Sequence, residues 1–130
     1  MPRSIEVPGL SHNAPIPLGA RVGAVVCSSG IAGKDPATGQ LPPDAATQAR
    51  LAFENLVRFL DAAGATLADV VKLTVYIKDN AVREAVNAGW LACFPDPHDR
   101  PARHILNYDL QHGMWLQLEA MAVIQNPRKD

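Results

Sequence analysis

The last hydrophobic segment, residues 114–124, constrains the fold of this 130-residue chain more than any other feature. Its sequence, MWLQLEAMAVI, predicts a β-strand, in which successive side chains point to opposite faces of a sheet. One face would carry Met114, Leu116, Leu118, Ala120 and Ala122, and the other Trp115, Gln117, Glu119, Met121 and Val123. Both faces are therefore largely apolar. An uncovered apolar face of this size usually marks an interface, so we expect a cyclic assembly of identical copies.

Periodicity and turn residues predict the remaining elements. Residues 44–63 place apolar side chains at steps of three and four, which is typical of a helix, and Gly64 marks its end. Residues 70–77, VVKLTVYI, alternate as a strand does. The other expected elements are a short edge strand at 3–7, a strand at 21–28, a helix at 82–94 and a strand at 104–108, with loops at 8–19 and 30–43.

This order of elements, β, β, α, β, α, β, β, favours an α+β domain in which both helices cover one face of a sheet of five or six strands. The chain is long enough for one such core but short for two, so we expect a single domain over residues 1–130. Hydrophobic residues make up 48% of the chain and charged residues 19%, which is typical of a folded globular protein rather than a disordered one.

Charge and cysteine content argue against several classes of protein. Lys and Arg number 12 against 13 for Asp and Glu, with no basic run, so nucleic acid is not expected as a partner. No segment approaches the roughly 20 apolar residues that span a bilayer, and the first ten residues lack the apolar core of a secretion signal, so we expect a cytoplasmic protein. Cys27 and Cys93 fit neither a disulfide framework nor a zinc site, and we expect both to be buried thiols.

Two charged residues in predicted strands are the main candidates for chemistry, because no nucleophile elbow, P-loop or other strong short motif is present. Arg103 stands at the start of one strand, and Glu119 lies among apolar residues in the next. In a structural interpretation they form a buried ion pair or reach separate solvent edges. In a functional interpretation the planar Arg103 guanidinium binds a substrate carboxylate while Glu119 handles water and protons.

Imine hydrolysis requires these two roles. An α-imino acid is already electrophilic, so an enzyme must chiefly hold its carboxylate, polarise the C=N bond and position a water in a dry pocket. Such a reaction needs no metal and no organic cofactor.

Several segments resemble the RidA/YjgF family of reactive-intermediate deaminases. They are PATGQLPPDAATQARLAFENLVRFLDAAGATLADVVKLTVYIKD, the pair Ser29-Gly30, Val86-Asn87 before Trp90 and Phe94, Pro101-Ala102-Arg103, and Leu118-Glu119-Ala120-Met121-Ala122. The similarity runs from about residue 13 to residue 123 without a large gap. The order and spacing of the pieces are specific, although no single piece is decisive.

The resemblance implies a chorismate-mutase-like mixed sheet, covered on one face by two helices, in a homotrimer with substrate clefts between adjacent subunits. In this family the arginine that matches Arg103 binds the substrate carboxylate, and the glutamate that matches Glu119 orients the attacking water. The other cleft positions match the loop Ser29-Gly30-Ile31 and the backbone N–H of Ile105.

Two positions depart from the family pattern. The family segment Gly-Pro-Tyr is Ala14-Pro15-Ile16 here, so the cleft would contain Ile16 in place of a tyrosine hydroxyl. A thiol common two residues after the arginine is replaced by Ile105, of which only the backbone amide is needed. These departures leave the substrate range open.

The other polar or aromatic candidates have structural interpretations. His104 should point away from the face that Arg103 occupies, because strand residues alternate. Trp115 shares the predicted face of Glu119, where it could wall the cleft or pack between subunits. Asn87 is expected to act as scaffold. The residues expected to be solvated in loops are His12, Asn13 and His112.

The leading hypothesis is a cofactor-independent hydrolase that converts small carboxylate-bearing imines or enamines to 2-oxo acids and ammonia. The missing tyrosine leaves open a deaminase or hydrolase specific for one catabolic enamine. A third hypothesis is a non-catalytic trimeric module that binds small carboxylates. Ribonuclease activity is disfavoured, because the sequence shows no basic surface studded with aromatic residues.

Overall fold

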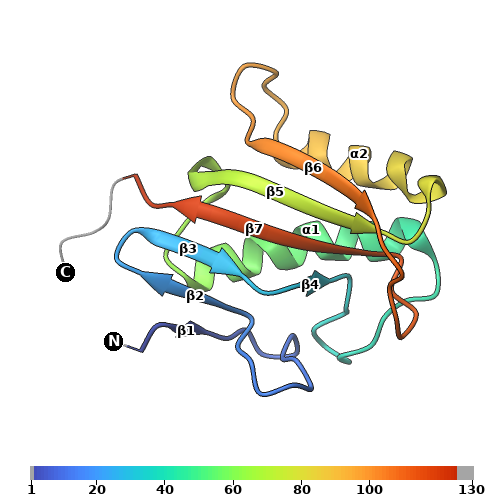
Figure 1. The fold of residues 1–130 in the computed structure, drawn as a ribbon, viewed down its shortest axis with the longest axis horizontal. Coiled ribbons are helices and arrows are strands. Elements are labelled where there is room, and N and C mark those ends of the chain that lie inside the picture. Colours follow the sequence, from blue (N-terminus) through green and yellow to red (C-terminus); the bar gives the residue numbers. More distant parts are fainter. Residues whose placement is uncertain (1, 126–130) are drawn as a thin grey trace.

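A mixed sheet forms the frame of the domain in the computed structural model, which describes residues 2–125 (Figure 1). Its strands are β1 (Ser4–Ile5), β2 (Gly19–Val22), β3 (Val25–Ser28), β4 (Ile31–Ala32), β5 (Val70–Ile77), β6 (Ala102–Asn107) and β7 (Leu116–Val123). They lie in the order β1-β2-β3-β7-β5-β6, and β4 also pairs with β7. Among the strand pairs of residues 2–125, only β5 and β6 run parallel, and a helical crossover joins them. The last strand of the sequence therefore lies at the centre of the sheet.

Two helices cover one face of this sheet, as expected from the sequence (Figure 1). They are α1 (Ala45–Ala62) and α2 (Arg83–Cys93). One short 3₁₀ turn, Leu67–Asp69, lies between α1 and β5, and another, Asn80–Val82, directly precedes α2. Asp44 caps α1 by accepting a hydrogen bond from the Thr47 backbone N–H at 2.9 Å. Gly64 follows the helix with a φ of +79°, which explains why glycine stands there.

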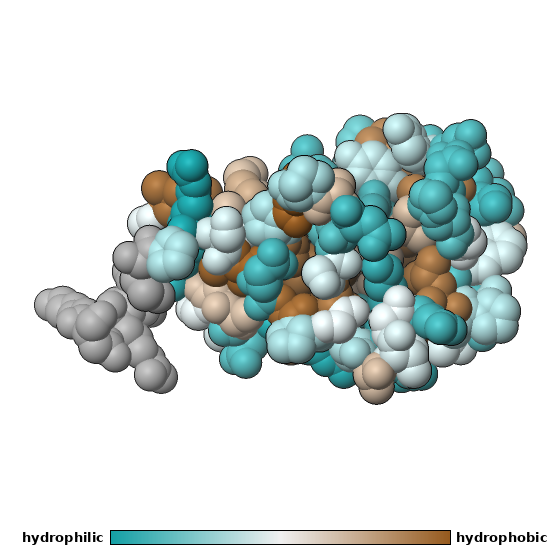
Figure 2. All heavy atoms as spheres, turned by 90° about the horizontal axis from the view of Figure 1, so that it is seen from below, coloured by the Kyte–Doolittle hydropathy of each residue, from teal (hydrophilic) through white to brown (hydrophobic). Residues whose placement is uncertain are grey.

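The predicted alternation of the last strand is confirmed. In β7 the side chains of Leu116, Leu118, Ala120 and Ala122 are buried against the helices, and those of Gln117, Glu119, Met121 and Val123 lie on the opposite face, called here the open face. Exposed apolar side chains on the open face are Val22, Val25, Leu106, Met121 and Val123. A view from the β1 edge shows hydrophobic side chains among the polar ones at the surface (Figure 2).

Three predictions about strands and thiols were wrong. Residues 21–28 do not form one strand, because Gly23 adopts a φ of +60° and the chain folds back as the β2–β3 hairpin. The expected loop at 30–43 contains β4, and this strand together with the divided segment 21–28 gives the sheet of residues 2–125 seven strands rather than five or six. Cys27 is exposed rather than buried, because it lies on the open face opposite Met121, and Cys93 is half-buried.

Candidate active site

Arg103 is held at the edge of the sheet by α2. It lies in β6 in register with the fully buried Leu73, so its side chain points to the helix-covered face. The guanidinium stacks over the Trp90 ring at 4.9 Å from the centroid, and its Nη1 donates a hydrogen bond to Asn87 Oδ1 at 2.9 Å. Among residues 2–125 no carboxylate lies within 4.0 Å of it. The guanidinium is therefore oriented, with N–H groups free to bind a carboxylate in bidentate fashion.

The Arg103 guanidinium is partly shielded from water and lies near a second positive charge, that of Arg83. Burial, and then the positive charge of Arg83, lower the pKa of the Arg103 guanidinium from its ordinary value. An arginine remains protonated at neutral pH despite such a shift. A carboxylate that docked here would offset both effects, since it would supply the missing negative charge. The buried ion pair with Glu119, one alternative of the structural interpretation, is absent from residues 2–125.

Glu119 lies on the open face. It is exposed in the middle of β7, in register with Thr74 of β5, and its carboxylate makes no hydrogen bond within residues 2–125. His104 is in register with the same threonine from the other side, so Glu119, Thr74 and His104 form a row across three strands. Two strand spacings separate the outer members by about 10 Å. His104 therefore points away from Arg103, as predicted.

Arg103 and Glu119 do not meet within one chain. The sequence places them on consecutive strands, but β5 lies between β6 and β7 in the sheet. Their register partners on β5, Leu73 and Thr74, are adjacent residues with opposite orientations, so the guanidinium and the carboxylate lie on opposite faces. A site that contained both groups would need each from a different copy of the chain.

The loop that was expected to line the cleft offers backbone rather than side chains. Ser29 Oγ donates to the Pro17 carbonyl at 2.9 Å, and Ile31 is only 1% exposed in the core. A Cβ on Gly30 would lie 2.2 Å from Nε2 at the end of the Gln117 side chain, so a larger residue there would force that side chain to move. Ile16 is 47% exposed near this loop, with an apolar side chain where the family has a hydroxyl.

Ile105 and Trp115 take different positions. Ile105 is half-buried in β6, on the same face as Arg103, and packs against the core. Trp115 precedes β7 and is fixed within its own chain: its backbone N–H donates to Gln48 Oε1 at 2.8 Å and its indole Nε1 donates to the Pro43 carbonyl at 2.9 Å. Its contacts therefore anchor the start of β7 to the beginning of α1.

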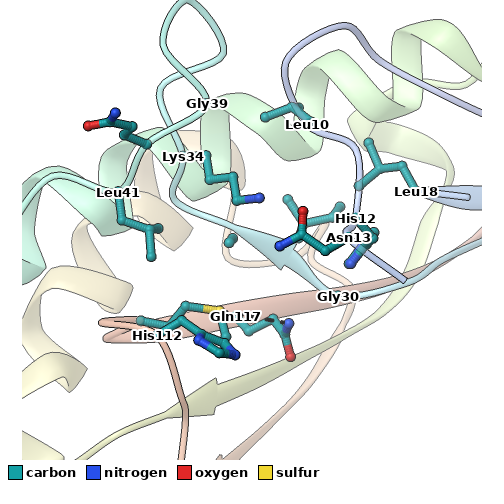
Figure 3. Close-up of a pocket in the computed structure, with 14 residues that line it drawn as sticks. Leu10, His12, Asn13, Leu18, Gly30, Lys34, Gly39, Leu41, His112 and Gln117 are labelled. Carbon is teal, nitrogen blue, oxygen red and sulfur yellow. Dashed lines mark hydrogen bonds between the residues drawn. The ribbon is translucent and has the colours of Figure 1, made fainter. Parts of the chain in front are cut away.

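A cavity of about 600 Å³ lies beside Gly30 and Ile31 (Figure 3). Its polar lining comes from the loop before β2, the segment after β4, the turn before β7 and β7 itself. These side chains are His12, Asn13, Lys34, Gln40, His112 and Gln117. No local pattern indicates this cluster, because its members are up to 105 positions apart, and three of them were expected to be solvated loop residues.

Residues 2–125 contain no group of three or more His, Cys, Asp or Glu side chains that could hold a metal ion. Within the same range, none of the helices has the length and apolar content needed to cross a membrane.

Comparisons with known proteins agree with the fold. The family described as endoribonuclease L-PSP matches residues 14–124. The chain is 37% identical over 121 residues to a RutC family protein of Haemophilus influenzae, covering 87% of this chain and 93% of that protein. It is 34% identical over 120 residues to the 2-iminobutanoate/2-iminopropanoate deaminase of Escherichia coli, covering 87% and 94%. The crystal structure of Escherichia coli TdcF with bound serine superposes with a TM-score of 0.84 at 31% identity, covering 93% of this chain and 98% of that one.

Proposed function

The chain belongs to the RidA/YjgF family, also described as endoribonuclease L-PSP, and we propose that it hydrolyses small 2-imino or 2-enamino acids to 2-oxo acids and ammonia. The observation that carries the proposal is Arg103, a guanidinium oriented by Asn87 and Trp90 with no carboxylate partner among the described residues. A related protein is named as a deaminase of 2-imino acids, and another binds serine, a small molecule with a carboxylate.

The proposed cleft lies between subunits of a homotrimer. Two features of one chain support this arrangement. The open face carries exposed apolar side chains, among them Val25 and Met121, that an adjoining copy would cover. Arg103 and Glu119 lie on opposite faces, so they can share one cleft only if neighbouring subunits supply them. Each cleft then contains Arg103 of one subunit and Glu119 of the next.

In the proposed mechanism Arg103 binds the substrate carboxylate, with the backbone N–H of Ile105 as a further donor. Glu119 accepts a proton from a water, whose oxygen attacks the C=N carbon and forms a tetrahedral amino alcohol. The proton is delivered to the nitrogen. The C–N bond then breaks while the Glu119 carboxylate accepts the hydroxyl proton and later releases it to solvent, and ammonia leaves with the 2-oxo acid. The positive charge of the protonated imine is matched by the carboxylate of Glu119.

The position of Ile16 bears on the choice of substrate. A side chain that offers no hydroxyl cannot donate a hydrogen bond to the substrate, so polarisation of the C=N bond depends more on Glu119 and on backbone groups. The second candidate function is therefore a deaminase specific for one enamine or imine, rather than one with a broad substrate range.

The test measures ammonia release from imines generated by an amino-acid oxidase. We expect the protein to accelerate release and the Arg103→Ala variant to lose at least about 100-fold in kcat/KM, since a charge-assisted bidentate contact is removed. Arg50→Ala, on the exposed side of α1, is the matched control and should leave the rate unchanged.

A non-catalytic carboxylate-binding module would give a different pattern. Small 2-oxo acids would raise the melting temperature in an Arg103-dependent way, while the protein left the rate of ammonia release at its background value. That result would replace the deaminase proposal.

A further inference from the structure

The cavity beside Gly30 has a charge composition suited to an anion. Its lining includes one ammonium, Lys34, together with imidazole and amide groups, and it contains no aspartate or glutamate. The remaining lining is apolar and comes from Leu10, Leu18, Ile31, Ala32, Leu41 and Met114, with Gly30 and Gly39. A volume of about 600 Å³ is within the range of sites for small organic ligands.

Lys34 is directed into this cavity by its backbone. The buried Asn55 donates through Nδ2 to the carbonyl oxygens of Ala32 at 3.0 Å and Lys34 at 2.8 Å, which fixes the segment after β4. The Lys34 ammonium points into the cavity toward Asn13 (Figure 3). Within residues 2–125 no carboxylate lies within 4.0 Å of this ammonium. A cation fixed in a concave site without a counter-charge favours an anionic ligand.

A second polar group in the cavity is also without a partner. The Nε2 atom of His12 is buried and makes no hydrogen bond within the described chain. Buried polar atoms nearly always have a partner, and an unpaired one often marks a functional position. His112, which has a φ of +63°, brings a further imidazole to the opposite wall next to Gln117 (Figure 3).

We propose that this cavity binds a second carboxylate of the substrate, at the end remote from the imine. The inference rests on the proposed function and on the family resemblance, which places the loop at Gly30 and Ile31 in the substrate cleft. The α-carboxylate would be held by Arg103 of the neighbouring subunit, and the distal carboxylate by Lys34 with His12 and Asn13. The substrates selected are dianionic imino or enamino acids with a short chain between their carboxylates.

The experiment compares two imines, those formed by oxidation of glutamate and of alanine, which differ in the distal carboxylate. We expect the native protein to show a kcat/KM about tenfold higher for the glutamate imine. Lys34→Met should lower that value about tenfold and leave the alanine imine within about twofold, since one charge-assisted contact is lost. The Arg50→Met control should change neither. Equal effects of Lys34→Met on both imines, or no effect, would overturn the inference.

Binding of 2-oxoglutarate, measured by calorimetry, separates this inference from the proposed function. If the native protein accelerates ammonia release from neither imine, the deaminase proposal is rejected. The dissociation constant of 2-oxoglutarate then tests the distal carboxylate site independently of catalysis. A dissociation constant at least about tenfold weaker in Lys34→Met, with pyruvate affinity unchanged, supports a distal carboxylate site. An unchanged dissociation constant for 2-oxoglutarate rejects it.

Discussion

Gln48 ties the start of α1 to the loop just before it and to the turn before β7, which is 65 positions away, and its replacement by methionine tests how the cavity region is held together. The side chain is fully buried near the start of α1. Its Nε2 donates to the carbonyl oxygens of Pro42 at 2.7 Å and Gly113 at 2.9 Å, and its Oε1 accepts from the Trp115 backbone N–H at 2.8 Å. Methionine has a similar length but leaves these three backbone groups without a partner.

The expected cost follows from the number of groups left unpaired. Each lost partner at a partly buried site costs about 1 kcal/mol, so Gln48→Met should lower the free energy of unfolding by about 3 kcal/mol. For a chain of 130 residues this corresponds to a fall in Tm of about 10 °C. Urea unfolding followed by circular dichroism measures the change, with variants compared at one subunit concentration because assembly also stabilises the fold.

Gln111 offers the matched control. Its amide is exposed and makes one hydrogen bond, to the Asp109 carbonyl at 3.2 Å, so Gln111→Met should change the free energy of unfolding by less than about 0.5 kcal/mol. A Gln48→Met variant within about 1 kcal/mol of that control would refute the reasoning, because it would mean that the three backbone groups find other partners at little cost.

Three further predictions concern the site, the assembly and a thiol. Asn87→Ala should raise KM more than it lowers kcat in the imine assay, reducing kcat/KM about tenfold, because Asn87 only orients Arg103; an equal fall in kcat with constant KM would assign it another role. Met121→Lys, on the open face, should convert the assembly to monomers in light scattering, whereas an intact oligomer would place the interface elsewhere. Burial raises the pKa of the Cys93 thiol, so a smaller fraction of it is thiolate at pH 8 than in an exposed cysteine. In a Cys27→Ser variant, the rate of Cys93 alkylation should therefore still increase above pH 9. A rate that is already constant by pH 8 would contradict this.

Those parts of the fold that carry a strong local pattern could be predicted from the sequence. In the two helices and in strands β5 and β7 the apolar residues recur at the spacing of the element, and the predicted boundaries agree with the observed ones to within a few residues. The β2–β3 hairpin was missed because RVGAVVCS reads as one valine-rich run, interrupted only by Gly23. Strand β4 has two residues and therefore no period.

The candidate site could be predicted only in its components. Arg103 and Glu119 were recognisable as charges in apolar strands, and their roles stay a prediction. Their orientation depends on β7 pairing on the far side of β5, a long-range choice that no local pattern records. The residues around Lys34 were missed for a similar reason, since only the folded chain brings together two loops and a turn.

The opposite orientation of Arg103 and Glu119 has a consequence for mixtures of defective subunits. If each cleft takes its arginine from one subunit and its glutamate from the next, a preparation of Arg103→Ala and one of Glu119→Ala would each be inactive alone. Random co-assembly of equal amounts would restore an intact pair in about one cleft in four, because each of two adjacent subunits has an even chance of being the right one. Two inactive alleles expressed in one cell could then complement each other.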